Sequence, residues 1–156
     1  MKSTKKRLAV EQLDQKLGAF KEAQHVVRPD KGWLFSIRTT LNMTLSQLAK
    51  RMNTTPQNIK AAESRESNGN ITLNALNEAA AAMEMKVVYA VVPKETSLNT
   101  LIHQKAALLA TQIVSRTSAS MKLEDQENTK LRLAKAIQDK TEEIEEELPR
   151  YLWESN

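Results

Sequence analysis

Residues 44–63, TLSQLAKRMNTTPQNIKAAE, contain the clearest structural signals in this chain. Leu48 and Ala49 give the first part of the stretch an apolar face at helical spacing. Thr44 and Gln47 fit a capping box, in which the two side chains satisfy each other's free backbone donors. The stretch therefore predicts a short helix that begins directly after Thr44.

The same stretch predicts a second short helix after a tight turn. Asn53 and Thr54 interrupt the first helix. Thr55 is a favoured N-cap, and Pro56 occupies the first helical position, where its missing N–H costs nothing. Two short helices joined this tightly are typical of a helix-turn-helix, which lays its second helix in the major groove of DNA while the first crosses the backbone.

One face of the second helix carries small, polar and cationic side chains, and the opposite face is expected to pack inward. Gln57 can form paired hydrogen bonds with an adenine edge, Asn58 can reach a base or a phosphate, and Ala61 leaves room for a thymine methyl group. Other side chains on this face and at the helix starts are candidates for phosphate contacts, which position the protein without specifying sequence. The alternative for each residue is an ordinary solvated side chain. The predicted DNA-binding residues are Thr44, Gln47, Thr55, Gln57, Asn58, Lys60, Ala61, Ser64 and Arg65.

The composition favours a mainly all-α protein. The chain has 156 residues with two each of Trp, Tyr and Phe and only three Gly, so Leu, Ile, Met and Ala must fill the core. It has no cysteine, which excludes disulfides and thiolate chemistry. It also lacks a signal-peptide pattern and any apolar run of about 18 residues. We therefore expect a cytoplasmic, nucleoid-associated protein with no membrane contact.

The charge is distributed unevenly along the chain. Residues 1–60 carry twelve Lys and Arg against four Asp and Glu, whereas residues 61–156 carry eleven against fifteen. A basic N-terminal part suits phosphate contacts, and an acidic C-terminal part suits repulsion from DNA or a basic partner. The alternative is that these charges lie on ordinary solvated helix faces.

Apolar spacing predicts further helices on both sides of residues 44–63. In a helix over 32–42, we expect Leu34, Ile37 and Leu41 to face inward. A long helix over 121–148 has an imperfect heptad pattern, which fits either a docking arm for a partner or packing on its own domain. The expected parts are an N-terminal helix (1–30), a helix-turn-helix DNA-binding domain (31–85), a short dimerising β-strand (86–93) and a helical C-terminal arm (94–156).

Residues 86–93, KVVYAVVP, form the only convincing strand pattern, because they are β-branched, continuous and closed by a proline. A lone strand is unstable, since its backbone groups need a partner. We therefore expect a homodimer joined partly by a two-stranded ribbon. The alternative is pairing with residues 25–27 of the same chain. The predicted dimerisation residues are Val87, Val88, Tyr89 and Val91.

Residues 31–84 resemble the lambda-repressor-like helix-turn-helix regulators of the XRE type. The matching features are T-L-S-Q-L-A at 44–49, N-T-T at 53–55, Ile59 and Glu63. Members of that family often pair an arginine of their first helix with the glutamate near the end of the recognition helix, so the resemblance implies a structural ion pair between Arg38 and Glu63. The chain departs from the family pattern at Asn53, Pro56 and Arg65, and these departures concern the base preferences and not the fold.

A narrower resemblance extends over nearly the whole chain. The segments MKSTKKRLAVEQLD, GWLFSIRTTLNMTLSQLAKRM and MKVVYAVVP are similar to the mobile mystery protein A family. That family accompanies a Fic-domain protein in a presumed toxin–antitoxin-like pair. The resemblance implies an antitoxin-like transcriptional regulator that binds the operator of its own operon as double-stranded DNA, with a Fic-domain toxin as a possible partner.

The sequence does not favour an enzyme. His25 and His103 are far apart, neither lies in a metal-ligand cluster, and no phosphate-binding glycine loop is present. We expect no cofactor and no metal. The alternative to a DNA-binding regulator is a protein–protein adaptor or inhibitor that acts through the C-terminal helices and shows little specific DNA binding.

Overall fold

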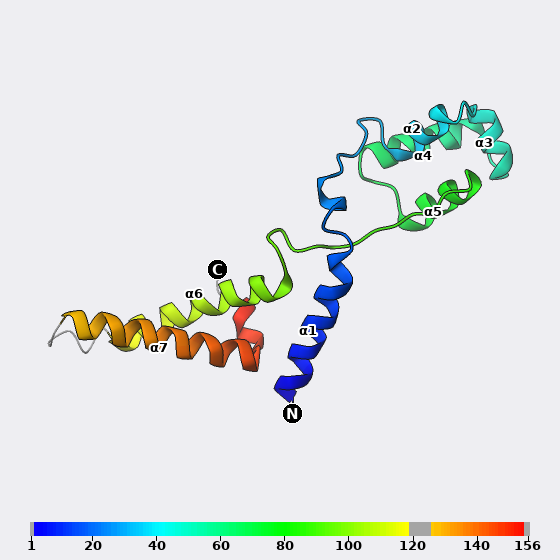
Figure 1. Cartoon of the computed structure of the whole chain (residues 1–156). Helices are drawn as coiled ribbons and strands as arrows, with labels where there is room; N and C mark the ends of the chain where they lie inside the picture. The colour runs from blue at the N-terminus through cyan, green and yellow to red at the C-terminus, as the bar shows by residue number, and fades with distance from the viewer. Residues whose placement is uncertain (1, 119–125, 155–156) are drawn as a thin grey trace. The chain divides into compact units, whose positions relative to one another are not determined.

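The computed structural model describes residues 2–118 and 126–154, and within them every regular element is helical (Figure 1). The helices are α1 (Lys2–Gly18), η1 (Ala23–His25), α2 (Trp33–Thr40), α3 (Leu45–Arg51), α4 (Pro56–Ser67), α5 (Leu73–Ala82), α6 (Leu98–Ser118), α7 (Gln126–Glu147) and η2 (Arg150–Trp153). The mainly all-α prediction is confirmed. Residues 121–125 of the helix expected over 121–148 lie outside the described residues.

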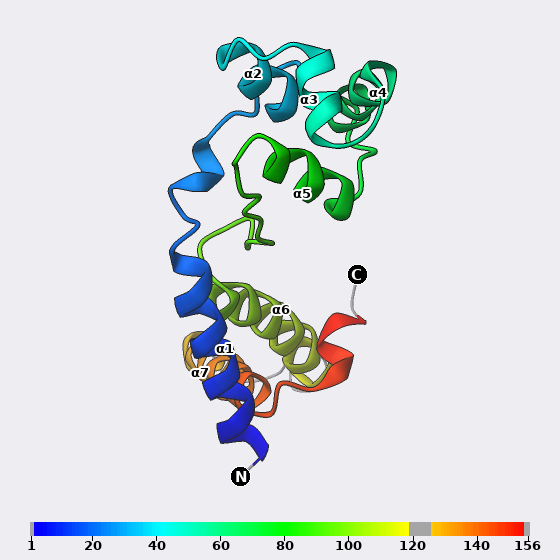
Figure 2. The ribbon, with the colours of Figure 1, turned by 90° about the vertical axis from the view of Figure 1, so that its right-hand side faces the viewer.

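The described chain divides into two compact units. One unit is Glu22–Ala90 and contains α2 to α5. The other unit combines α1 with α6, α7 and η2. In Figure 2, the helices α2, α3 and α4 lie together above α5.

The two caps that the sequence predicts for α3 and α4 are confirmed. The Thr44 hydroxyl accepts a hydrogen bond from the Gln47 backbone N–H at 3.1 Å, and the Gln47 side chain accepts one from the Thr44 N–H at 2.9 Å. Thr55 caps α4 by accepting from the Asn58 N–H at 3.2 Å. Between the two helices, Asn53 has a φ of 51°, a left-handed conformation that Asn adopts more readily than most residues. These local signals determine where both helices begin.

The core of Glu22–Ala90 is formed by the inward faces of its four α-helices. Its buried members are Leu34, Leu48, Ala49, Ile59, Ala79 and Met83. Ile37 packs against this core, as expected. The inward orientation expected for Leu41 is wrong, because Leu41 is 49% exposed. The reason is that α2 ends at Thr40 and Asn42 turns the chain with a φ of 55°. Leu41 therefore remains at the surface.

In the other unit, α1 packs against both α6 and α7. The core there consists of Ala106, Ala110, Ile144 and Leu152. The Asp14 carboxylate accepts hydrogen bonds from the Leu98 and Asn99 N–H groups at 2.7 and 3.1 Å, at the start of α6. Lys6 donates to the carbonyls of Glu147 and Leu148, at the end of α7. Each charge has the sign that the adjacent helix end favours.

The strand predicted at 86–93 is wrong for the chain by itself. Within the described residues, no strand is formed there and no backbone hydrogen bond pairs these residues with another segment. The alternative pairing with residues 25–27 is also wrong, because His25 and Val26 bond locally to Glu22 and Ala23. A strand needs a neighbour to satisfy its backbone groups, and the described chain offers none to this segment.

Candidate nucleic-acid interface

The outward face of α4 brings together most of the side chains that the sequence predicts to contact DNA. All nine predicted residues are exposed, and all belong to Glu22–Ala90. Six of them lie on α4, namely Gln57, Asn58, Lys60, Ala61, Ser64 and Arg65. Thr44 and Gln47 lie at the start of α3, and Thr55 caps α4. The predicted surface is therefore accessible and is centred on one helix.

Charge is separated across α4. Its two carboxylates, Glu63 and Glu66, belong to residues that are only 6% and 4% exposed. Its two cations, Lys60 and Arg65, are exposed, and neither forms an ion pair within the described part of the chain. The outward face of α4 therefore carries positive charge without a carboxylate to neutralise it.

Glu63 fixes α4 to α2 through a buried ion pair with Arg38. The Arg38 Nε and Glu63 Oε1 atoms lie 2.5 Å apart, and Arg38 Nη2 donates to Glu63 Oε2 at 3.3 Å. Arg38 Nη1 also donates to the Met43 carbonyl at 2.8 Å. Every nitrogen of the guanidinium group is thus engaged, so Arg38 holds α2, α4 and the segment before α3 together.

Glu66 is a structural residue that the sequence analysis missed. Its carboxylate accepts hydrogen bonds from the Trp33 and Leu34 N–H groups at 2.8 and 2.9 Å, which satisfies free donors at the start of α2. Arg28 donates to the Glu66 carbonyl at 2.8 Å. Gly32 has a φ of 84°, and an added Cβ atom would lie 2.5 Å from Glu66 Oε2. The available signal was the three-residue spacing that places Glu66 on the same helix face as Glu63.

The side chains that are predicted to contact bases differ in how many of their polar atoms already form hydrogen bonds within the described chain. Gln57 forms no side-chain hydrogen bond within the described residues, so both ends of its amide are available. Asn58 Nδ2 donates to the Thr54 hydroxyl at 2.8 Å, which orients the side chain and leaves its carbonyl oxygen available. The Gln47 carbonyl oxygen is used in the capping box, which leaves its amino group. Gln57 is therefore the least constrained candidate for base contact.

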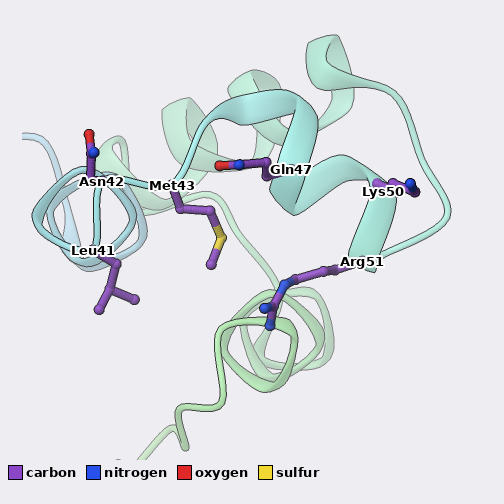
Figure 3. A pocket seen from close by; sticks show the side chains of 6 residues that line it. All are labelled: Leu41, Asn42, Met43, Gln47, Lys50 and Arg51. Carbon is purple, nitrogen blue, oxygen red and sulfur yellow. The ribbon is translucent and has the colours of Figure 1, made fainter.

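An open hollow of about 590 Å³ lies beside α3 (Figure 3). It is lined by Leu41, Asn42, Met43, Gln47, Lys50 and Arg51. Figure 3 shows the Arg51 side chain reaching toward α5, where it donates to the Ala82 carbonyl at 3.1 Å. Its Nη1 atom also lies 3.7 Å from Glu84 Oε1. Lys50 is the other cation of the lining, and no carboxylate or nucleophilic thiol lines the hollow with it. The lining offers no acid–base pair for catalysis.

Comparisons with protein families, curated proteins and solved structures found no match to this chain. Among the described residues, no group of three or more His, Cys, Asp or Glu side chains is arranged to hold a metal ion. Over the same residues, no helix has both the length and the apolar character needed to cross a membrane.

Proposed function

We propose that the chain is a sequence-specific DNA-binding transcriptional regulator, in which α3 and α4 act as a helix-turn-helix and α4 enters the major groove. The observation that carries this proposal is the charge separation on α4. Both carboxylates face inward and hold α2, while both cations and the free amide of Gln57 face outward. Such a face attracts phosphates and can form hydrogen bonds with base edges.

The contacts within Glu22–Ala90 support this role by holding α4 at two places along its length. Glu63 is paired with Arg38, and Glu66 caps α2. A recognition helix must be rigid to place several side chains against bases at once, because each base contact depends on hydrogen-bond geometry. We propose that the protein binds an inverted-repeat operator as a homodimer, with half-sites about one helical turn apart.

The proposal is tested by a mobility-shift titration on the DNA just upstream of the protein's own gene. We expect Gln57→Ala to weaken binding by about 1–3 kcal/mol and to relax the preference at one base position. The double variant Gln57→Ala/Asn58→Ala should weaken it further. The matched control is Asn74→Ala/Asn77→Ala, which removes two exposed amides from α5. Equal binding by the test and control variants, or no preference over scrambled DNA, would contradict the proposal.

Salt dependence tests the phosphate contacts separately. Each phosphate that a cation neutralises makes the slope of log affinity against log salt more negative by about 0.9. We expect Lys60→Gln and Arg65→Gln each to reduce the magnitude of this negative slope by about 1. Lys5→Gln removes an exposed cation from α1 and serves as the control. A slope that changes equally in all three variants would show that the α4 cations have no special role.

The antitoxin-like role rests on the resemblance to the mobile mystery protein A family alone. By that resemblance, the protein represses its own operon and acts beside a Fic-domain toxin. A reporter placed under the upstream promoter is expected to be repressed by the wild-type protein and released by the Gln57→Ala/Asn58→Ala variant. No repression by the wild-type protein would favour the alternative of a protein–protein adaptor acting through α6 and α7, and repression that is unchanged in this variant would reject the base contacts assigned to Gln57 and Asn58.

A further inference from the structure

An apolar groove lies on the outer side of α2. Its volume is about 260 Å³, and its apolar lining is Pro29, Trp33, Ile37, Leu41 and Met85. The remaining lining residues, Ser36 and Thr40, carry hydroxyl groups, so no charged side chain lines this α2 groove. Trp33, Leu41 and Met85 keep 42–49% of their surface exposed. An exposed apolar patch without charge is typical of the centre of a protein–protein interface.

The α2 groove ends at Met85, and a segment whose backbone lacks hydrogen-bond partners begins there. Directly after Met85, residues 86–90 form no regular secondary structure, and their backbone groups have no hydrogen-bond partner within the described chain. Val88 and Tyr89 are 65% and 68% exposed. Exposed β-branched and aromatic side chains on a backbone without partners form a surface that favours association. The two features are continuous at Met85, and both belong to Glu22–Ala90.

We propose that the α2 groove and residues 86–90 form the homodimer interface, with the segment of each copy seated against the groove of the other. This inference deepens the proposed function, since it assigns the surface through which the regulator would dimerise. A second copy fits because a two-fold axis beside Met85 places the segment of each copy against the groove of the other, so the same contact forms twice and buries both features of both copies.

The area that a stable dimer interface needs also favours an interface made of both the α2 groove and residues 86–90. A specific interface buries about 800 Å² per partner and takes about 20–30 residues from each side, so a five-residue segment is too small by itself. The α2 groove adds the exposed parts of Trp33 and Leu41. None of its lining residues is among the nine predicted to contact DNA. Dimerisation through this surface therefore leaves the outward face of α4 free.

Sedimentation equilibrium of the full chain without DNA tests the inference. We expect Leu41→Glu to raise the dimer dissociation constant by at least about tenfold. The matched control is Leu73→Glu, because Leu73 is 47% exposed against 49% for Leu41 and does not line the groove. Both positions are at the surface, so both variants should keep the helical circular dichroism of the wild type. A monomeric wild-type protein, or equal effects of the two substitutions, would overturn the inference.

Cysteine cross-linking tests the seating of the segment directly, because the chain has no cysteine of its own. We expect oxidation of a mixture of Leu41→Cys and Tyr89→Cys proteins to give disulfide-linked heterodimers. A mixture of Asn74→Cys and Tyr89→Cys should give none, since Asn74 lies on α5. Equal cross-linking in the two mixtures would overturn the proposed seating.

The proposed dimer interface and the proposed DNA-binding function can be rejected independently of each other. Selective operator binding by a wild-type protein that remains monomeric in solution would reject this interface and leave the proposed function standing. A dimer that is disrupted by Leu41→Glu but has no preference for operator DNA would retain the interface and reject the DNA-binding function.

Discussion

Replacing Glu63 with alanine is expected to lower the free energy of unfolding of Glu22–Ala90 by about 3–5 kcal/mol. The side chains of Arg38 and Glu63 are only 9% and 8% exposed. Without Glu63, the Arg38 guanidinium would remain buried with the Met43 carbonyl as its hydrogen-bond acceptor and the Phe35 ring beside it, and neither carries a counter-charge. A buried charge that has lost its counter-charge is much more costly than a broken surface ion pair.

This loss of stability can be measured by urea denaturation in a Trp153→Phe background, with tryptophan fluorescence as the signal. Trp33 is then the remaining tryptophan of the two, and it reports on Glu22–Ala90. Glu78→Ala is the control, because it removes an exposed carboxylate from α5 and should change stability by less than about 0.5 kcal/mol. A loss for Glu63→Ala no larger than that of the control would contradict the prediction.

A double variant separates the lost charge from the lost volume. Arg38→Met/Glu63→Leu removes both charges and keeps apolar side chains in their place. We expect it to recover most of the stability lost in Glu63→Ala, because replacing both members of a buried pair by apolar groups is often neutral or stabilising. A double variant that is as unstable as Glu63→Ala would show that an unpaired charge is not the cause.

Replacing Leu152 with alanine is expected to destabilise the unit formed by α1, α6, α7 and η2 by about 2–5 kcal/mol. Leu152 has 0% exposure and packs with Ala106, Ala110 and Ile144. Two of these neighbours are alanines, whose short side chains cannot extend into a cavity. The loss should therefore include both the transfer of apolar surface and the cavity that remains.

Amide hydrogen exchange is the suitable measurement, because it resolves the two units within one chain. In Leu152→Ala, protection should fall in α6 and α7, while protection in α3 and α4 should stay near the wild-type level. Leu131→Ala is the control, since Leu131 is on α7 and is 72% exposed. Equal losses of protection in the two variants would contradict the prediction.

Several features of the fold were predictable because they depend on residues close in sequence. The capping box at Thr44 and Gln47 and the cap at Thr55 act over three residues, so the helix starts follow from local pattern. Helical periodicity likewise placed Ile59 inside and Gln57 outside. The exposure of the α4 candidate face was therefore predictable.

Other features depend on residues that are distant in sequence and were missed. Asp14 caps α6 across 84 residues, and Glu66 caps α2 across about 32. Neither acceptor has a local signal that identifies its donor, since the pairing depends on how the helices pack. Leu41 was assigned to the core by periodicity alone, but α2 ends one residue before it.

The sequence by itself determined where α3 and α4 begin, how they are joined and which face of α4 is polar and cationic, because caps and periodicity act within a few residues. Only the tertiary structure decided that Glu63 and Glu66 are buried against α2, that α1 packs against α6 and α7, and that residues 86–93 pair with nothing in the described chain. These outcomes required the helices to pack first, since burial and backbone pairing depend on neighbours far along the chain.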